Sequence, residues 1–301
     1  MIDPKRYGVS FSLKQCRDLG IDQHDTLAWL IEQGWRRFRL MSYWNEHEKQ
    51  PGKYDFSALD VQIAQIRKAR GIITLCLGAR QPRWPENHWP DWAWNAPKQE
   101  RTEALLHYIE QVVNRYKNEL CIVSYQLENE ALFKLFGKRP EIDRSRLRTE
   151  FGLVKQLDPK RPVIMSVSDP WGIPLIGPIP DIVGFSYYAV LWNAPVHRYT
   201  TAGMSVIWHR ARARLIRWLL HRPTYIHELQ CEPWGPQPIW DMLTTEQDKS
   251  MNVEQIKQNI RAGQKTHLYP IDLWGGEWWY WRHKQGDDSI WEAVQHSLQE
   301  L

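Results

Sequence analysis

Short apolar runs alternate with segments of helical periodicity along the whole chain, and this alternation limits the folds that the sequence can adopt. Eight runs are present: YGVSFS (7–12), RRFRLM (36–41), IITLCL (72–77), CIVSYQL (121–127), PVIMSV (162–167), DIVGFSY (181–187), PTYIHE (223–228) and PIDLW (270–274). They are rich in Val, Ile, Leu and Phe and do not alternate strictly with polar residues, which is typical of strands covered on both faces.

Most segments between these runs show the apolar spacing of amphipathic helices. The spacing is clear at Leu27, Leu30 and Ile31, at Leu59, Ile63 and Ile66, at Tyr108, Ile109 and Val112, at Leu147, Phe151 and Val154, at Val253, Ile256 and Ile260, and at Ile290, Val294 and Leu298. One connection differs, because the segment between 162–167 and 181–187 carries Pro170, Pro174, Pro178 and Pro180. Proline breaks helices, so we expect this connecting helix to be short or missing.

Eight strand–helix units with no linker between them predict an α/β protein, a single (β/α)8 barrel over residues 1–301. An open, doubly wound sheet is the alternative fold. It is less favoured, because no Gly-x-Gly-x-x-Gly turn follows the first strand. In such barrels the reactive residues stand at the carboxyl ends of the strands, so the residues that end each run are the candidates for the active site.

Composition narrows the function classes. The net charge of +4 is small for 301 residues and argues against a dedicated nucleic-acid-binding protein. The four cysteines form no Cys-x-x-Cys pair, so no disulfide framework is predicted. The first apolar run starts at Tyr7, which leaves no room for a signal peptide, and no run is long enough to cross a membrane. We leave the compartment open.

Tryptophan is unusually frequent, with 18 in 301 residues. Packing alone rarely needs so many, because the indole is large and its N–H group seeks a hydrogen-bond partner. Flat aromatic rings also stack on sugar faces. We expect some of these rings to belong to the core and others to a carbohydrate site.

Two predicted strands end in a carboxylate next to another polar residue. Asn129 and Glu130 follow the fourth run, and His227 and Glu228 end the seventh. Two carboxyl groups that converge on one cavity are the groups that hydrolyse glycosidic bonds, where one protonates the leaving oxygen and the other attacks or activates water. A single glutamate is more often a solvated loop residue. Two glutamates at the ends of two predicted strands favour a catalytic role more strongly than one does.

Several segments together resemble the retaining glycoside hydrolases of clan A, the (β/α)8 barrels that include β-galactosidases, β-glucuronidases, cellulases, mannanases and xylanases. The similar segments span nearly the whole chain: FRLMSYWNEHEKQPGKYDFSALD (38–60), QLENE (126–130), DIVGFSYY (181–188), YIHELQCEPWG (225–235) and LWGGEWW (273–279). The resemblance implies a retaining β-glycoside hydrolase that acts on a β-linked oligo- or polysaccharide through a covalent glycosyl-enzyme, with no metal or other cofactor.

The resemblance also assigns roles. Glu130 resembles the acid/base and Glu228 the nucleophile, whereas Glu128 and Glu232 are nearby carboxylates without a clan role. The same comparison assigns residues that would contact the substrate or the nucleophile. Asn129 resembles the amide that holds the sugar 2-hydroxyl, and Arg39 resembles the guanidinium that keeps the nucleophile ionised. Tyr187 resembles the phenol that hydrogen-bonds the nucleophile, with Tyr188 as the alternative, and Trp274 resembles the platform under the sugar, with Trp278 as the alternative.

Two features leave the family within the clan unassigned. His227 precedes the nucleophile where several families have other residues, and GARQPRWP (78–85) lacks a histidine that some families carry. Aromatic residues are dense in 82–94 and 274–283, and we expect about half of these rings to form stacking subsites for a glycan chain. The candidates are Trp84, Trp89, Trp278 and Trp279.

Other functions were considered. A metal-dependent sugar enzyme could draw ligands from NEHE (45–48) and from His227 with Glu228, but no His-Glu-x-x-His motif is present. A serine hydrolase would need a Gly-x-Ser-x-Gly elbow, which the sequence lacks. A carbohydrate-binding barrel without catalysis is compatible with the fold, although loss of a strand-end glutamate would be its signature.

The segment WHRARARLIRWLLHR (208–222) carries five arginines and no acidic residue. One interpretation is a barrel helix with its leucines turned inward and its arginines solvated. The other is an interfacial helix that contacts anionic lipid at the membrane surface. Both interpretations remain open from the sequence.

Overall fold

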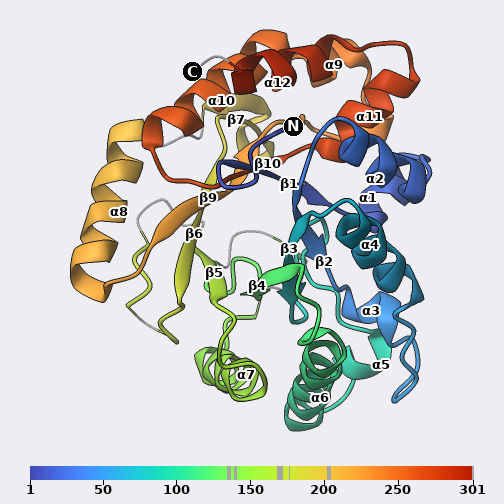
Figure 1. Ribbon diagram of the computed structural model, residues 1–301, viewed down its shortest axis with the longest axis vertical. Coiled ribbons are helices and arrows are strands. Elements are labelled where there is room, and N and C mark those ends of the chain that lie inside the picture. The colour runs from blue at the N-terminus through green and yellow to red at the C-terminus, as the bar shows by residue number, and fades with distance from the viewer. Residues whose placement is uncertain (134–136, 139–140, 168–171, 176, 202–204, 300–301) are drawn as a thin grey trace. The chain divides into compact units, whose positions relative to one another are not determined.

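The computed structural model describes residues 1–133, 137–138, 141–167, 172–175, 177–201 and 205–299. Eight parallel strands close into a barrel in the order β1-β10-β9-β6-β5-β4-β3-β2 (Figure 1). The barrel strands are β1 (Tyr7–Phe11), β2 (Arg37–Met41), β3 (Ile72–Leu77), β4 (Ile122–Leu127), β5 (Val163–Val167), β6 (Ile182–Tyr187), β9 (Thr224–Gln230) and β10 (Ile271–Trp274). This confirms the predicted α/β barrel. Each predicted strand agrees with the observed one to within two residues.

Helices connect most of these strands. They are α1 (Leu13–Asp18), α2 (Gln23–Glu32), α3 (Trp44–His47), α4 (Ser57–Lys68), α5 (Asp91–Trp94), α6 (Lys98–Tyr116), α7 (Arg144–Leu157), α8 (Val206–Leu220), α9 (Thr244–Gln247), α10 (Val253–Thr266), α11 (Gly276–Lys284) and α12 (Ser289–Gln299). Side chains cap several helix starts, because the first backbone N–H groups of a helix have no partner within it. Asp22 caps α2, and Asn252 caps α10.

The connection between β5 and β6 contains no helix among its described residues, 172–175 and 177–181. This confirms the prediction of a short or missing helix there. Pro174, Pro178 and Pro180 lie in this part, whereas Pro170 lies outside the described residues. Each proline lacks the N–H group that an α-helix needs and clashes with the preceding turn.

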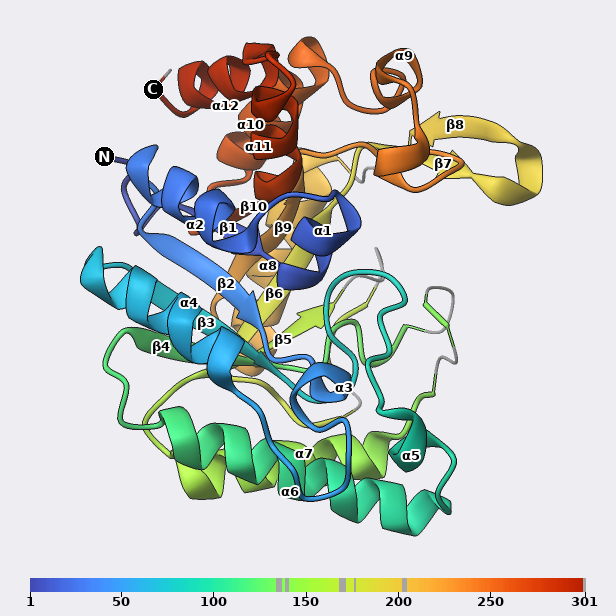
Figure 2. The ribbon, with the colours of Figure 1, turned by 90° about the vertical axis from the view of Figure 1, so that its right-hand side faces the viewer.

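A two-stranded hairpin, which the sequence analysis did not predict, follows β6. Strand β7 (Val190–Asn193) pairs antiparallel with β8 (Arg198–Thr201), and a short 3-10 turn (Ala194–Val196) joins them (Figure 2). His197 completes the turn in the left-handed conformation at φ +47°. The hairpin stands between β6 and α8 in the sequence. The apolar residues at 190–192 therefore belong to a strand and not to that helix.

The chain divides into two compact units. Unit 1 comprises Met1–Arg36, Phe185–Leu219 and Thr224–Leu301, and unit 2 comprises Arg37–Gly184 and Leu220–Pro223. The prediction that residues 1–301 form one catalytic domain stays a prediction.

Tryptophan contributes to the core of both units. In unit 1, Trp279 packs against Trp35 and Trp291, with ring centroids 5.9 Å from each. In unit 2, Trp44 stacks on Tyr108 at 5.4 Å. Much of the tryptophan content therefore serves packing, because large aromatic side chains bury more apolar area than other residues.

Candidate active site

The turn after β4 carries the first group of predicted site residues, and it is buried. Glu128, Asn129 and Glu130 are only 1%, 3% and 8% exposed. Glu128 and Glu130 both adopt the left-handed conformation, at φ +45° and +48°, which is unusual for residues other than glycine. A solvated loop would not require two strained residues in three. Such strain tends to collect at functional sites, where the surroundings hold the backbone in place.

A network of hydrogen bonds fixes the Asn129 amide. Its Oδ1 accepts from Arg39 Nη2 at 3.1 Å and from Gln126 Nε2 at 3.0 Å. Its Nδ2 donates to Glu86 Oε2 at 2.9 Å. Arg39 is completely buried and also donates from Nε to Gln126 Oε1 at 2.6 Å. The predicted residues Arg39 and Asn129 are therefore in direct contact, and the guanidinium orients the amide.

Ser166, at the end of β5, positions the backbone of Glu130. The Glu130 N–H group donates to Ser166 Oγ at 2.7 Å, and the same hydroxyl donates to Asn129 Oδ1 at 3.4 Å. Neighbouring strands β4 and β5 thus hold the turn together. The sequence analysis missed Ser166 and Glu86. The position of Ser166 next to the end of an apolar run was the only signal that could have indicated it.

Glu128 ties the turn after β4 to the turn after β3. Its carboxylate accepts from the backbone N–H groups of Ala79 at 2.9 Å and Arg80 at 2.8 Å. Gly78, at φ +99°, makes room for this contact, because a Cβ atom there would lie 2.6 Å from Glu128 Oε1. Both oxygens of the Glu128 carboxylate are therefore committed to joining the two turns.

Behind Glu128 lies a second buried carboxylate, Glu150 on α7. One guanidinium stands beside both: Arg146 Nε is 2.8 Å from Glu150 Oε1, and Arg146 Nη2 is 3.9 Å from Glu128 Oε1. Burial raises the pKa of Glu150 well above its usual value, and the negative charge of Glu128 raises it further. Burial also raises the pKa of Glu128, although Arg146 and the two backbone donors oppose this.

Glu228, the predicted nucleophile, lies on β9 and is 3% exposed. The strand continues to Gln230, two residues beyond the predicted end. Glu228 Oε2 accepts a hydrogen bond of 2.9 Å from the hydroxyl of Tyr188. The preferred candidate for this contact, Tyr187, packs its ring 5.2 Å from that of His209 on α8. The competitor Tyr188 therefore makes the contact, because β6 ends at Tyr187 and the next side chain turns toward Glu228.

Gln230 connects β9 to the hairpin. Its Oε1 accepts from the N–H groups of Ala189 at 2.8 Å and Val190 at 3.1 Å, and its Nε2 donates to Val190 O at 2.8 Å. The hairpin also meets the loop after β9, where Trp192 N–H donates to Trp234 O at 3.1 Å. These bonds hold the segment that carries Tyr188 against the strand that carries Glu228.

Half-buried aromatic rings surround this part of unit 1. The rings of Tyr188 and Trp234 meet edge to face at 5.7 Å, and Trp192 meets Tyr199 in the same manner at 5.2 Å. Sequence reasoning did not single out Trp192 or Trp234. Trp234 lies in CEPWG (231–235), directly after β9, and that position was the available signal.

Trp274, the predicted platform, ends β10 and is 6% exposed. Its Nε1 donates to Glu232 Oε1 at 2.8 Å, and its backbone carbonyl accepts from Cys231 N–H at 2.9 Å. Glu232 thus has one oxygen committed to holding the indole of Trp274.

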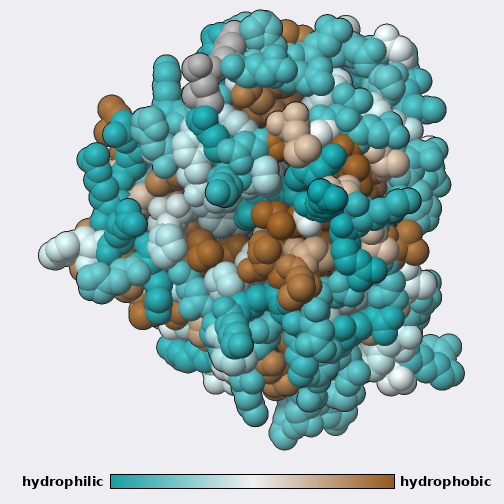
Figure 3. Space-filling view, viewed as in Figure 1, coloured by the Kyte–Doolittle hydropathy of each residue, from teal (hydrophilic) through white to brown (hydrophobic). Residues whose placement is uncertain are grey.

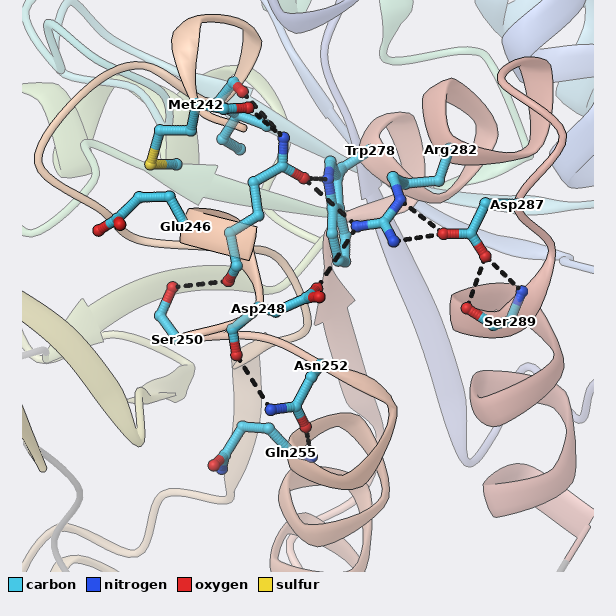
Figure 4. Close-up of polar contacts among 12 residues, drawn as sticks. Met242, Glu246, Asp248, Ser250, Asn252, Gln255, Trp278, Arg282, Asp287 and Ser289 are labelled. Carbon is cyan, nitrogen blue, oxygen red and sulfur yellow. Dashed lines mark hydrogen bonds and ion pairs between the residues drawn. The ribbon is translucent and has the colours of Figure 1, made fainter. Parts of the chain in front are cut away.

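The other tryptophan candidates divide into buried and exposed rings. Trp278 and Trp279 have no exposed surface, whereas Trp89 and Trp274 keep 8% and 6% of theirs. Trp278, the rival of Trp274 for the platform, is therefore completely buried, and its role as a platform stays a prediction. Its Nε1 donates to Gln247 Oε1 at 2.8 Å inside a polar network that includes Arg282 and Asp287 (Figure 4). Trp84 is 53% exposed and remains available for stacking.

The predicted residues fall into two groups. Arg39, Trp84, Asn129 and Glu130 lie in unit 2, and Tyr187, Tyr188, Glu228, Trp274 and Trp278 lie in unit 1. Within the described ranges, no three histidine, cysteine, aspartate or glutamate side chains are grouped as a metal site would require. The closed barrel of parallel strands defines the class of fold, and each unit holds one of the two buried glutamates.

Comparisons with known proteins place this fold among glycoside hydrolases. No protein-family model matches the sequence, and no curated protein matches it either. Solved structures do match, and all the similarities reported below are at 11–13% sequence identity, which shows the fold alone.

Three matches illustrate the similarity. The chain superposes over 100% of its length on 82% of GH5_18 from Streptomyces cattleya in complex with GlcNAc, with a TM-score of 0.65 and 13% identity. It superposes over 99% on 97% of a GH10 endo-β-1,4-xylanase from Gloeophyllum trabeum (TM-score 0.63, 11% identity). It superposes over 99% on 68% of Xylanase10C from Cellvibrio japonicus in complex with xylopentaose (TM-score 0.66, 12% identity).

The chain shares the barrel fold of the clan A glycoside hydrolases, as the sequence resemblance implied. The chain spans 97% of the length of the Gloeophyllum trabeum xylanase but only 50% of the length of a β-galactosidase from Rahnella sp. R3 that it also matches.

Proposed function

We propose that the protein is a retaining β-glycoside hydrolase that acts on a β-linked oligo- or polysaccharide. The observation that carries the proposal is the position of two buried glutamates, Glu130 directly after β4 and Glu228 on β9, in a closed barrel of parallel strands. Reactive groups of such barrels stand at the carboxyl ends of the strands. The fold shared with glycoside hydrolases supports the same function.

In the proposed first step, Glu130 gives its proton to the glycosidic oxygen while a carboxylate oxygen of Glu228 bonds to the anomeric carbon. The bond from that carbon to the leaving oxygen breaks, and a glycosyl ester of Glu228 forms. In the second step Glu130 takes a proton from water, whose oxygen attacks the anomeric carbon and releases Glu228. This mechanism requires the two carboxyl groups to be about 5–5.5 Å apart.

Neighbouring residues have supporting roles in the proposal. Tyr188 donates to Glu228 Oε2, which stabilises its negative charge and restricts rotation of the carboxylate. Arg39 and Ser166 hold Asn129, whose Nδ2 would bind the sugar hydroxyl next to the scissile bond. Trp274 and the exposed Trp84 would stack on sugar rings. We propose no cofactor and regard residues 1–301 as one catalytic domain.

The proposed partner is a glycan. Two of the three structures described above contain sugars, GlcNAc in one and xylopentaose in the other. The aromatic rings beside Glu228 fit a ligand of the same kind, since sugar faces stack on flat rings.

The stereochemistry of the product tests the mechanism. Proton NMR of the first product released from a β-glycoside should show the β-anomer, because two successive inversions retain the configuration. Initial release of the α-anomer would contradict the double displacement. A panel of β-linked glycans, with analysis of the fragments, would then identify the sugar and the linkage.

A carbohydrate-binding barrel without catalysis is the second candidate. It would bind the same glycans but would not release a chromogenic phenol from aryl β-glycosides. Binding without turnover across the glycan panel, by a protein whose folded state is confirmed by circular dichroism, would favour that function over hydrolysis.

A further inference from the structure

One face of helix α8 is buried in the described part of the protein. His209, Arg212, Ala213 and Ile216 are buried on that face. The His209 ring lies 6.0 Å from Phe185, and the Arg212 guanidinium lies 4.3 Å from the centroid of the same ring. Ser205 accepts from Trp208 N–H at 3.2 Å and so caps the start of the helix. These contacts hold one side of the helix and leave its other side facing outward.

The outer face of α8 carries large apolar side chains. Ile207 is 78% exposed and Trp218 is 73% exposed, and Leu215 and Leu219 are about 40% exposed (39% and 42%). Ile207 and Trp218 are eleven residues apart, a spacing that places them on nearly the same side of an α-helix. Figure 3 shows hydrophobic side chains among hydrophilic ones along the edge where α8 lies in Figure 1. A solvated barrel helix would have polar residues at these positions.

The structure corrects one of the two interpretations of this segment. The solvated-helix interpretation placed Leu215, Ile216, Leu219 and Leu220 together on the inner face. Only Ile216 among them is fully buried, while Leu215 and Leu219 face outward. Apolar residues and arginines are therefore mixed on the exposed side of α8.

The charge of this face has one sign. Arg214 and Arg217 are exposed and Arg210 is half-buried, and α8 contains no acidic residue. Among the described residues, none forms an ion pair with these three arginines. A solvated helix of a nearly neutral protein would usually interleave acidic side chains, as α6 does with Glu100, Glu103 and Glu110.

We propose that α8 docks on an anionic lipid surface, with its axis along the membrane plane. Ile207, Leu215, Trp218 and Leu219 would enter the boundary between head groups and acyl chains, while the arginines bind lipid phosphates. Arginine suits this position, because its long apolar stem stays in the boundary while the guanidinium reaches the phosphates. This proposal does not depend on the proposed glycosidase activity.

Three other binding partners fit the outer face of α8 less well than anionic lipid does. Nucleic acid would use the arginines but has no place for exposed isoleucine and leucine on the same face. A second copy of this chain would bring a second set of unpaired arginines against the first, which costs free energy. A protein partner usually covers about 800 Å² on each side, a large area for one helix about 22 Å long.

Co-sedimentation of the full chain with vesicles tests the proposal. The protein should bind vesicles containing 30% phosphatidylserine, bind pure phosphatidylcholine vesicles far less, and dissociate as salt is raised. The triple variant Arg210→Gln, Arg214→Gln, Arg217→Gln should lower the partition coefficient on the order of 100-fold, since each arginine contributes roughly five-fold near such a surface. The double variant Ile207→Ser, Trp218→Ser should lower it at least about ten-fold.

A matched control separates local docking from net charge. Arg144→Gln, Arg148→Gln and Lys160→Gln remove three exposed positive charges elsewhere, and this triple variant should bind vesicles nearly as the unmodified protein does. Equal loss in both triple variants would overturn the proposal, because binding would then follow net charge alone. So would equal recovery in the supernatant with and without anionic vesicles, or a dimer in solution that is lost on Trp218→Ser.

Among the described residues, no helix is both long enough and apolar enough to cross a membrane.

Discussion

The hydroxyl of Tyr188 donates a hydrogen bond of 2.9 Å to Oε2 of Glu228. Both residues are held in place, Glu228 within β9 and Tyr188 by the bonds between Gln230 and the start of the hairpin. A phenol in this position stabilises an ionised carboxylate and fixes its orientation. It therefore offers a direct test of whether Glu228 is the reacting group.

Tyr188→Phe should lower kcat/KM about 10- to 100-fold, because a hydrogen bond to a charged group contributes roughly 1.5–3 kcal/mol. Tyr187→Phe is the matched control. Its ring packs against His209 and no hydrogen bond from its hydroxyl to Glu228 is described, so the rate should change less than about three-fold. A larger loss from Tyr187→Phe would assign the phenol role to that residue. Steady-state kinetics on an aryl β-glycoside measures both effects.

Glu228→Gly should abolish turnover, and added azide should restore release of the aglycone, giving a glycosyl azide of inverted configuration. The small anion fills the space of the missing carboxylate and attacks the anomeric carbon from the same side.

Glu232→Gln is the control for this second prediction. Glu232 Oε1 accepts from Trp274 Nε1, and the amide oxygen of glutamine can keep that bond. Activity should remain within about ten-fold of the unmodified protein. If Glu232→Gln were inactive and rescued by azide, the nucleophile would have to be reassigned to the loop after β9.

Much of the barrel was predictable because its strands are covered on both faces, which leaves continuous apolar runs in the sequence. The end of β4 was also predictable, since Asn129 and Glu130 interrupt such a run. The choice between Tyr187 and Tyr188 was not, because it depends on where β6 stops. Sequence gives strand ends only to within a few residues, and a shift of one residue reverses the direction of a side chain.

Exposure was harder to predict than position. The segment 274–283 reads as an aromatic loop, but it forms α11, which buries Trp278 and Trp279 against unit 1. In α8 the reverse occurs, and leucines that a helical pattern assigns to the core face outward. In both cases the burial of a side chain depends on neighbours that come from distant parts of the sequence.

The pair of buried carboxylates behind the β4 turn predicts a dependence of stability on pH. The pKa of Glu150 is raised in the folded state, so folding is favoured when Glu150 carries its proton. This contribution is complete below the usual pKa of a glutamate, about 4.3, and is lost as the pH rises toward the folded-state pKa. Glu150→Gln should therefore gain stability relative to the unmodified protein as the pH rises from 4 to 8.

Urea unfolding at several pH values measures this difference. The free energy of unfolding of Glu150→Gln, minus that of the unmodified protein, should increase with pH. Its slope should be at most about 1.4 kcal/mol per pH unit, which corresponds to one proton. Arg148→Gln, an exposed change two residues away, should give a difference that does not vary with pH. Parallel stability curves for Glu150→Gln and the unmodified protein would mean that Arg146 keeps Glu150 ionised throughout this range.

Glu130→Gln tests the acid/base role, and the leaving group decides its effect. With a 2,4-dinitrophenyl β-glycoside, the first step needs no proton, because the phenolate leaves unaided. The glycosyl ester of Glu228 should therefore still form, seen as a burst of phenol, and then accumulate, because no base activates water. With an unactivated alkyl glycoside the variant should lose on the order of 100- to 10,000-fold in kcat/KM.

Added azide completes the test of Glu130→Gln. Azide needs no general base, so it should accelerate turnover of the trapped ester and yield a β-glycosyl azide, the retained configuration. This product is opposite to the one expected from Glu228→Gly, and the pair of products assigns each glutamate independently. Ser166→Ala is the matched structural control, since it loosens the Glu130 backbone without removing the carboxyl group. Ser166→Ala should lower kcat/KM for alkyl glycosides and for activated glycosides to a similar degree. If Glu130→Gln also lowered kcat/KM equally for both substrates, the general acid would be another residue.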